Sequence, residues 1–229
     1  MQAVRRQAAA TSVLAGSLRR HDLREPAQGL LDALGVGLAA NTDRLSVPGA
    51  RGTLIVANHV SWLDIVAALA VEPAAFLAKH DVRAWPVIGS LAARCGTVFV
   101  DRRTMRRLPE VVAALAEKLR RGRSVVVFPE GTTWCGACGP GVFRRAAFQA
   151  AIDADAPIRP VTLEYDQAGE PSTIAAFVGA DPLPASVRRV ARARDLRIRL
   201  TAQPAFAADA DRRALAARAG MSIRRAAHV

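Results

Sequence analysis

The sequence of 229 residues predicts an α/β fold: a layered domain with a largely parallel or mixed central sheet flanked by helices, preceded by an N-terminal helical segment. Beyond residue 50, short runs rich in β-branched residues alternate with longer segments rich in alanine and leucine. Hydrophobic residues make up 51% of the chain and charged residues 23%, which suits a sizeable core. No internal repeat or composition break divides the chain after residue 50. We therefore expect the N-terminal segment over residues 1–45 and one domain over residues 46–229.

The N-terminal segment has a helical pattern bounded by arginine pairs at positions 5–6 and 19–20. Its apolar residues Val4, Ala8, Leu14 and Leu18 fall roughly on one helical face. This pattern is typical of a helix that lies on a membrane surface, and a helix packed on its own domain fits it nearly as well. A cleaved or anchoring segment stays open as a third interpretation.

The expected strands are apolar and β-branched runs that end in polar, glycine or proline residues. In chain order they are Thr53–Ala57, Ala74–Ala78, Thr97–Val100, Ser124–Phe128, Ile158–Glu164, Ile174–Val178 and Leu196–Thr201. The expected helices are Ser61–Val71, Ala84–Arg94, Thr104–Arg120, Gly141–Ala154, Ala185–Ala193 and Asp209–Arg225. Sheets of this kind bind ligands outside the carboxyl ends of their strands, so functional residues should directly follow strands.

The charge balance favours a polyanionic partner, because 32 Lys+Arg stand against 20 Asp+Glu and give a net charge of +12. Only Lys79 and Lys118 are lysines, and arginine binds phosphate bidentately. Nucleic acid is the rival partner, but aromatic residues make up only 5% of the chain and no nucleic-acid-binding module is recognised. We therefore expect no nucleic acid and prefer an anionic membrane surface. A solvated basic face without a partner stays open for the arginines near the C-terminus.

The cysteines Cys95, Cys135 and Cys138 are an odd number, which favours a reducing compartment over a disulfide framework. Cys135 and Cys138 form a CxxC pair, but no second ligand pair with metal-site spacing accompanies it. We therefore expect no metal site. A redox dithiol is the remaining functional alternative for this pair.

A histidine and a carboxylate follow the strand Thr53–Ala57. His59 and Asp64 cannot meet within one continuous helix, because residues five apart point about 140° away from each other. They meet if the helix begins at Ser61, a good N-cap, with His59 in the preceding turn. Asp64 then orients the imidazole and leaves its other nitrogen free as a general base. A cap carboxylate beside an ordinary turn histidine is the structural alternative.

Two further strand exits carry polar residues. Glu130, Gly131 and Thr132 follow Ser124–Phe128 and suit an anion or hydroxyl site, although a simple Pro/Gly turn explains them as well. Arg102 follows Thr97–Val100, where its guanidinium would suit a phosphate with Asp101 beside it.

Together these segments resemble the lysophosphatidic acid acyltransferases (1-acylglycerol-3-phosphate O-acyltransferases) of the glycerolipid acyltransferase superfamily. Asn58-His59 to Asp64 match NHxxxxD, Phe128 to Thr132 match FPEGT, and Gly96, Phe99 and Arg102 match the block between them. The fourth block is matched by the segment 158–161 around Pro160. The order and separations agree over roughly residues 50–180.

The resemblance implies acyl transfer from acyl-CoA or acyl-carrier protein to the hydroxyl of a lysophospholipid, without a further cofactor. It implies that His59 is the general base, that Asp64 orients it and that Arg102 binds the acceptor phosphate. It places Glu130, Gly131 and Thr132 in the acceptor-binding site, and Lys79, just past a strand, is a weaker candidate for the phosphate pocket. It also implies a peripheral enzyme on the cytoplasmic face of the cell membrane, with a hydrolytic thioesterase as an alternative.

Two departures from the family pattern bear on the acceptor. Phe143-Arg144-Arg145-Ala146 stands where family members often carry Phe-Lys-x-Gly, and the segment 134–139 with its two cysteines replaces a Ser/Asp-rich loop. The basic charge is kept, but the glycine is lost. The acceptor is therefore left open between 1-acylglycerol-3-phosphate and another lysolipid such as lyso-ornithine lipid.

Overall fold

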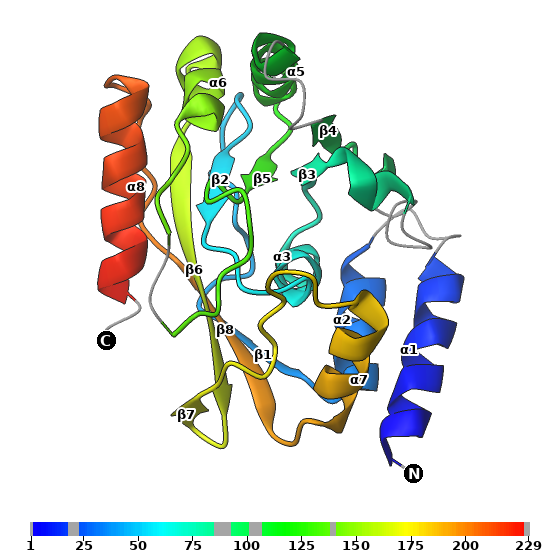
Figure 1. The fold of residues 1–229 in the computed structure, drawn as a ribbon. Coiled ribbons are helices and arrows are strands. Elements are labelled where there is room, and N and C mark those ends of the chain that lie inside the picture. The colour runs from blue at the N-terminus through cyan, green and yellow to red at the C-terminus, as the bar shows by residue number, and fades with distance from the viewer. Residues whose placement is uncertain (1, 18–22, 85–92, 101–106, 138–140, 227–229) are drawn as a thin grey trace.

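The computed structural model describes residues 2–17, 23–84, 93–100, 107–137 and 141–226. Its centre is an eight-stranded sheet (Figure 1). Seven strands follow one another in the order β1-β8-β6-β2-β5-β3-β4, and the eighth, β7, pairs with β6 beside this path. The strands are β1 (Gly37–Ala40), β2 (Leu54–Ala57), β3 (Ala75–Lys79), β4 (Val98–Val100), β5 (Val125–Val127), β6 (Ile158–Gln167), β7 (Glu170–Pro171) and β8 (Leu196–Ala202). Strands β2 to β6 are mutually parallel, whereas β8 pairs with β6 antiparallel and β1 pairs with β8 parallel. The sheet is therefore mixed, as expected.

Helices cover both faces of the sheet (Figure 1). They are α1 (Gln2–Ser17), α2 (Arg24–Leu34), α3 (Leu63–Val71), α5 (Leu108–Arg120), α6 (Ala146–Ala154), α7 (Leu183–Arg192) and α8 (Arg212–Ala226), with a short 3-10 helix η1 (His80–Ala84). One core cluster joins α2, α3 and α7 to Ile55 and Val126 of the sheet. The other joins α5, α6 and α8 to Leu54 and Val125. Successive residues of β2 and β5 thus point into two separate cores on opposite faces of the sheet. Both strands are therefore apolar at every position.

The expected N-terminal helix is present and packs on the rest of the chain. Helix α1 contacts α2 and α7, and the Arg6 guanidinium donates to the Ala193 carbonyl oxygen at 2.8 Å. Val4 is 69% exposed, whereas Ala10 belongs to a core cluster. Among the described residues, no helix is both long and apolar enough to cross a bilayer.

The structure corrects one strand prediction. Residues 174–178, expected as a strand, form a turn-containing loop, because their carbonyl groups bind a side chain instead of a neighbouring strand. Arg189 donates to the carbonyl oxygens of Ile174 and Ala176 at 2.8 and 2.7 Å. Strands β1 and β7 were not expected: β1 contains no β-branched residue and forms because β8 offers it a paired edge.

Several helix boundaries also differ from the prediction. Helices α3 and α6 begin later than predicted, at Leu63 and Ala146. The segment 84–94, expected as a helix, lies largely outside the described residues, as does the predicted start of α5 at Thr104.

Candidate active site

The predicted site residues meet at the carboxyl ends of two adjacent central strands. His59 follows β2, Glu130 follows β5, and these strands pair in parallel. Asp64 lies in the first turn of α3, the helix that continues from β2. Strand exits at the middle of a parallel sheet are the usual position of ligand sites in α/β folds.

His59 and Asp64 are in direct contact: His59 Nδ1 lies 2.8 Å from Asp64 Oδ2. The contact forms because the chain turns before the helix begins. Asp64 Oδ2 also accepts hydrogen bonds from the backbone N–H groups of Val60 and Ser61, at 2.7 and 2.9 Å. The bond to Ser61 N–H is the carboxylate half of the expected capping box, although the helix itself starts two residues beyond Ser61.

Asp64 is fully buried, with 0% exposure, and its second oxygen is occupied as well. The Tyr165 hydroxyl, from β6, donates to Asp64 Oδ1 at 2.5 Å. Burial and the neighbouring Asp64 carboxylate raise the pKa of Tyr165 well above its usual value, so this hydroxyl remains a proton donor. These donors satisfy both oxygens of Asp64, and a carboxylate beside Nδ1 stabilises the imidazolium that forms when His59 takes up a proton.

The His59 ring contacts the Asp64 carboxylate through Nδ1 and the Phe128 ring through its face. It stacks on Phe128 with ring centroids 4.0 Å apart and 14° between the planes. Its side chain keeps 18% exposure, while Nδ1 is taken by Asp64. Nε2 is therefore the nitrogen left to exchange a proton with a bound molecule.

The Glu130 carboxylate binds main-chain N–H groups of this site. One carboxylate oxygen accepts from the His59 backbone N–H and the other from the Gly141 N–H, both at 2.6 Å. The residue is 5% exposed, and burial raises its pKa to about 7, against the smaller lowering effect of the two backbone donors. In this structure both of its oxygens bind protein groups, and its predicted part in acceptor binding stays a prediction.

The rest of the segment 128–133 is shaped by its backbone. Gly131 has a φ of +75°, and a Cβ there would lie 2.9 Å from Arg144 Nε, so glycine fits both the conformation and the space. Thr132 is exposed, whereas the Thr133 hydroxyl donates to the Phe177 carbonyl oxygen. The predicted binding roles of Gly131 and Thr132 stay predictions.

The two predicted phosphate ligands are placed differently. Lys79 is the exposed last residue of β3, and β5 lies between β3 and β2, so its strand is not adjacent to the one that carries His59. Arg102 lies outside the described residues. Cys138 also lies outside them, and Cys135 is half-buried. Within the described part of the chain, no group of three or more His, Cys, Asp or Glu side chains is arranged to hold a metal ion.

Tyr165 and Phe128 are site residues whose contacts with Asp64 and His59 the sequence did not reveal. Tyr165 comes one residue after the predicted end of its strand, and only the adjacency of β6 and β2 brings it to Asp64. The same adjacency pairs the Asn58 side chain with the Leu163 backbone through two hydrogen bonds of 2.8 Å. The apolar residue before the Pro129-Glu130 turn was the available signal for Phe128.

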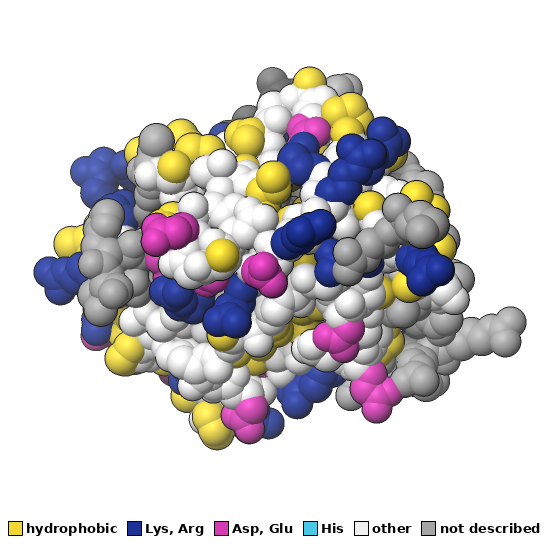
Figure 2. All heavy atoms as spheres, turned by 90° about the horizontal axis from the view of Figure 1, so that it is seen from below, with side chains coloured by type: hydrophobic (Ala, Val, Ile, Leu, Met, Phe, Trp, Pro, Cys, Tyr) yellow, Lys and Arg dark blue, Asp and Glu magenta, His cyan; other side chains and the backbone are white. Residues whose placement is uncertain are grey.

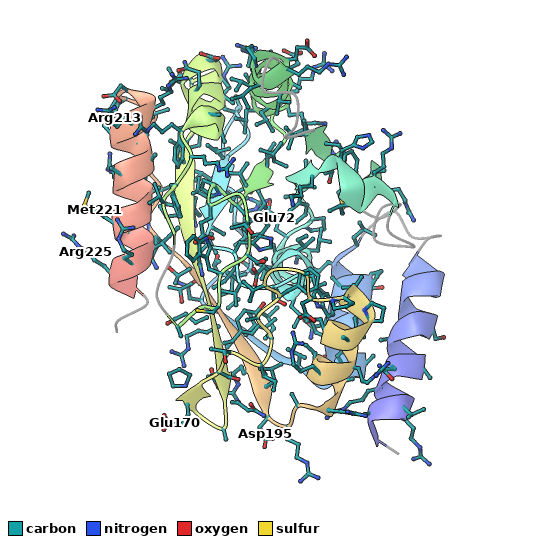
Figure 3. The ribbon with its side chains drawn as sticks, viewed as in Figure 1. Glu72, Glu170, Asp195, Arg213, Met221 and Arg225 are labelled. Atoms are coloured by element: carbon teal, nitrogen blue, oxygen red, sulfur yellow. The ribbon has the colours of Figure 1, made fainter. Side chains whose placement is uncertain are left out.

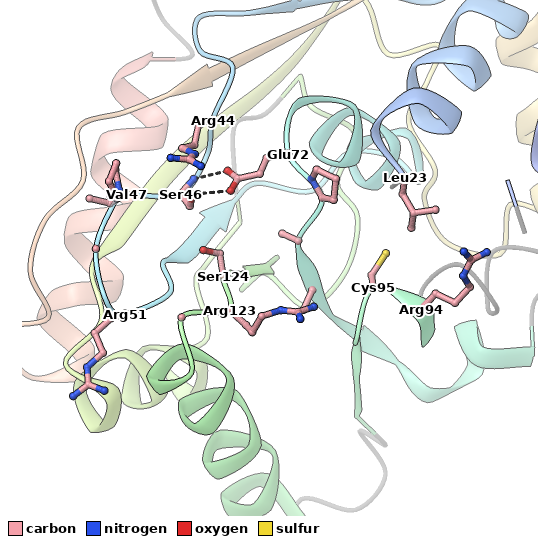
Figure 4. Close-up of a pocket in the computed structure, with 16 residues that line it drawn as sticks. Leu23, Arg44, Ser46, Val47, Arg51, Glu72, Arg94, Cys95, Arg123 and Ser124 are labelled. Atoms are coloured by element: carbon pink, nitrogen blue, oxygen red, sulfur yellow. Dashed lines mark hydrogen bonds between the residues drawn. The ribbon is translucent and has the colours of Figure 1, made fainter. Parts of the chain in front are cut away.

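A hollow lies away from this site (Figure 4). It measures about 760 Å³ and is lined by residues at the amino ends of β3 and β5, including Ala75 and Ser124. Its acidic residue, Glu72, is already bonded to the backbone N–H groups of Leu45 and Ser46 and to the Ser46 hydroxyl, at 2.6 to 2.7 Å. The hollow and the His59 site thus occupy opposite ends of the parallel strands.

The mixed α/β fold places a His-Asp pair with a buried carboxylate at a central strand exit, and this arrangement suits an enzyme that transfers a proton to and from a bound substrate. The chain belongs to the acyltransferase family: the family model described as Acyltransferase matches residues 40–164. It is therefore an acyltransferase.

The chain matches relatives that are named for two different acceptor lipids. It is 38% identical over 183 residues to a 1-acyl-sn-glycerol-3-phosphate acyltransferase of Neisseria meningitidis serogroup B, which covers 80% of this chain and 70% of the relative. It is 41% identical over 139 residues to a lyso-ornithine lipid O-acyltransferase of Pseudomonas aeruginosa, covering 61% and 53%.

A solved structure shares the fold. The crystal structure of the 1-acyl-sn-glycerophosphate acyltransferase PlsC from Thermotoga maritima matches with a TM-score of 0.64 and 20% sequence identity. The match covers 99% of this chain and 93% of that one.

Proposed function

We propose that this acyltransferase moves a fatty acyl group from a thioester, acyl-CoA or acyl-carrier protein, to the free hydroxyl of a lysophospholipid. The observation that carries the proposal is the contact of 2.8 Å between His59 Nδ1 and the buried Asp64 carboxylate. It leaves one imidazole nitrogen for substrate and provides a fixed anion to balance the positive charge that His59 acquires.

The proposed reaction needs no covalent acyl-enzyme. His59 Nε2 takes the proton of the acceptor hydroxyl as its oxygen attacks the thioester carbonyl carbon. The new C–O bond forms, the C–S bond breaks, and the departing thiolate recovers the proton from the imidazolium. A positioned base of this kind contributes ~10²–10⁴ in rate.

We propose 1-acylglycerol-3-phosphate as the main acceptor, which gives phosphatidic acid. The relative from N. meningitidis, named for that acceptor, supports this choice because the similarity extends over 80% of this chain. Arg102 is the proposed ligand of the acceptor phosphate, with Lys79 as a weaker second candidate.

Lyso-ornithine lipid is the second candidate acceptor. The P. aeruginosa relative carries that name at 41% identity, although over a shorter part of the chain. Lyso-ornithine lipid has no phosphate, so the contribution of Arg102 separates the two candidates.

We propose a peripheral location on the cytoplasmic face of the cell membrane, where thioester donors and membrane lipids are both within reach. The net charge of +12 supports attachment to an anionic leaflet.

An acceptor panel tests the proposal. Radiolabelled acyl-CoA is supplied with 1-acylglycerol-3-phosphate, lyso-ornithine lipid or no acceptor, and both acylated lipid and free fatty acid are measured. We expect the wild type to acylate the phosphate-bearing acceptor with little free acid, and His59→Ala to lose ~10²-fold or more with its fold intact.

His80→Ala is the matched control, since His80 is an exposed histidine of η1 outside the site. A wild type that acylates no lysolipid would sink the substrate assignment, and one that only releases free acid would make the enzyme a thioesterase. A His59→Ala variant as active as wild type would sink the mechanism.

A further inference from the structure

Large exposed hydrophobic side chains gather in the loops that surround His59. Trp134 is 40% exposed, Val142 88% and Val178 44%. The described residues expose only two further large hydrophobic side chains, Val4 on α1 and Met221 on α8. We call Trp134, Val142 and Val178 the apolar rim.

Main-chain contacts tie each rim residue to the site. The Trp134 N–H donates to the His59 carbonyl oxygen at 2.8 Å, and Gly141, which precedes Val142, donates to Glu130. Phe177, which precedes Val178, donates its N–H to the Val60 carbonyl oxygen at 3.0 Å. Hydrogen bonds therefore fix the loops of the rim close to the His59 segment.

The rim residues are also close to one another. A Cβ on Gly141 would lie 2.4 Å from the Trp134 indole, so the ring packs directly on the backbone next to Val142. The hydroxyl of Thr133 donates to the carbonyl oxygen of Phe177, which places the residues before Trp134 and Val178 in contact. The loops that carry the three rim residues are therefore in contact with one another.

The charges beside the rim are positive. Segment 131–145 contains no acidic residue and ends in Arg144 and Arg145, and Arg144 lies against Gly131. Segment 172–181 contains one acid, Asp181, which is paired with Arg189 at 2.6 Å. Figure 2, which views the molecule from below the orientation of Figure 1, shows hydrophobic, Lys/Arg and Asp/Glu side chains scattered over that face. An indole and two valines beside Arg144 and Arg145 match the interface of an anionic bilayer.

We propose that the apolar rim is a membrane-docking surface, which enters the interfacial region of an anionic bilayer and brings His59 to the depth of a glycerol hydroxyl. This inference rests on the proposed function, because a lysophospholipid acceptor resides in such a bilayer. It differs from attachment by surface arginines, since it orients the entrance of the site toward the lipid.

Fluorescence quenching tests the insertion. Vesicles of phosphatidylcholine with phosphatidylglycerol, carrying bromine on the acyl chains near the headgroup, quench an indole that enters the interface. Trp62 is buried at 7% exposure, so Trp134 is the exposed reporter among the tryptophans of the described residues. We expect quenching in the wild type that Trp134→Phe removes, and equal quenching in both proteins would overturn the proposal.

Vesicle binding and activity test the valines without a change in charge. The double variant Val142→Ser/Val178→Ser is compared with Met221→Ser, whose side chain points outward from α8 on another part of the surface and is 48% exposed (Figure 3). We expect the double variant to bind the anionic vesicles about tenfold more weakly, which equals about 1.4 kcal/mol, and Met221→Ser to bind as wild type does. Equal losses in both variants would overturn the proposal.

A short-chain monomeric lysophospholipid separates this inference from the proposed function. We expect the double variant to acylate the monomeric acceptor at the wild-type rate and the vesicle-borne acceptor more slowly. Failure of the wild type on both acceptors would refute the proposed function instead. If the double variant were impaired on the monomeric acceptor only with acyl-carrier protein as donor, the rim would be a protein-docking surface and the membrane proposal would be wrong.

Discussion

The Asp64 carboxylate is the most heavily bonded side chain of the site. It accepts from two backbone N–H groups, contacts His59 and receives the Tyr165 hydroxyl, all without exposure to water. When a buried carboxylate loses one of its hydrogen-bond donors, the free-energy cost of its desolvation remains and is no longer offset by that hydrogen bond. Tyr165 therefore acts on His59 through Asp64, as a positioning residue rather than a catalytic one.

Tyr165→Phe removes this donor, together with the hydrogen bond between the Tyr165 hydroxyl and the Ser61 side chain. We expect a loss of about 1–3 kcal/mol in the free energy of unfolding. Without the hydroxyl, Asp64 is held less firmly and orients the His59 ring less well, so kcat should fall while KM changes little. Denaturant unfolding and steady-state kinetics check the two effects. A kcat equal to that of the wild type would leave Tyr165 a purely structural residue.

Glu130 predicts a pH dependence of stability. Burial raises its pKa from 4.5 to about 7, so the folded protein holds this proton more tightly than the unfolded chain does. The resulting stabilisation is complete below pH 4.5 and is lost as the pH rises through about 7. One pKa unit corresponds to about 1.4 kcal/mol, so the loss should be on the order of a few kcal/mol.

Glu130→Gln isolates this contribution. Glutamine offers one carbonyl oxygen to the two N–H donors, which lowers stability by an amount that does not vary with pH. We expect the wild type to lose stability relative to Glu130→Gln between pH 5 and pH 8, measured by urea unfolding at several pH values. A constant difference between the two proteins would contradict the raised pKa.

At the scale of elements, the loop 172–182 is held in place by one arginine of α7. Arg189 binds the carbonyl oxygens of Ile174 and Ala176 as well as Asp181. The Ser186 hydroxyl, next to it on α7, accepts a hydrogen bond from the Trp62 indole N–H at 3.1 Å. Helix α7 thus fixes both the loop and the residue that precedes α3.

Arg189→Ala should release the loop. We expect a loss of about 1–3 kcal/mol in the free energy of unfolding, because buried or partly buried acceptors are left without their donor. We also expect faster protease cleavage within residues 172–182 and a lower kcat. Arg188→Ala is the matched control on the exposed side of α7 and should stay within about 0.5 kcal/mol of wild type. Equal effects of the two substitutions would argue against the loop contact.

The elements also show what the sequence could predict. The core strands were predictable because β2 and β5 are apolar throughout, and the His59 to Asp64 geometry followed from the requirement that the helix start after His59. The loop 174–178 was predicted wrongly, since IAAFV has an apolar pattern that suits a strand, while its hydrogen-bond partner is a distant arginine. Tyr165 could not be assigned to Asp64 because the contact depends on which strands are neighbours.

At the scale of the whole molecule, the positive charge is spread over several helices. Arg224 and Arg225 are exposed at the end of α8, and Arg213 lies on the same helix (Figure 3). These side chains have no proposed role in chemistry. An anionic leaflet attracts each such residue by about 1 kcal/mol, and this attraction weakens with salt because the Debye length falls.

Arg224→Glu/Arg225→Glu tests this contribution. We expect about tenfold or greater weakening of binding to phosphatidylglycerol-containing vesicles at low salt, and little difference at high salt. Activity on a monomeric acceptor should be unchanged. Co-sedimentation at several salt concentrations checks the expectation, and equal pelleting of the wild type with neutral and anionic vesicles would contradict it.

The hydrogen bonds from the loops 134–142 and 172–178 to the His59 segment are mainly backbone bonds: Trp134 N–H to His59, and Phe177 N–H to Val60. Backbone groups are the same in every amino acid. These two bonds can therefore persist when the side chains of Trp134 and Phe177 are replaced, and the position of the His59 segment is then retained. A His59 segment held by backbone bonds suits a family in which relatives of this chain are named for two different acceptors.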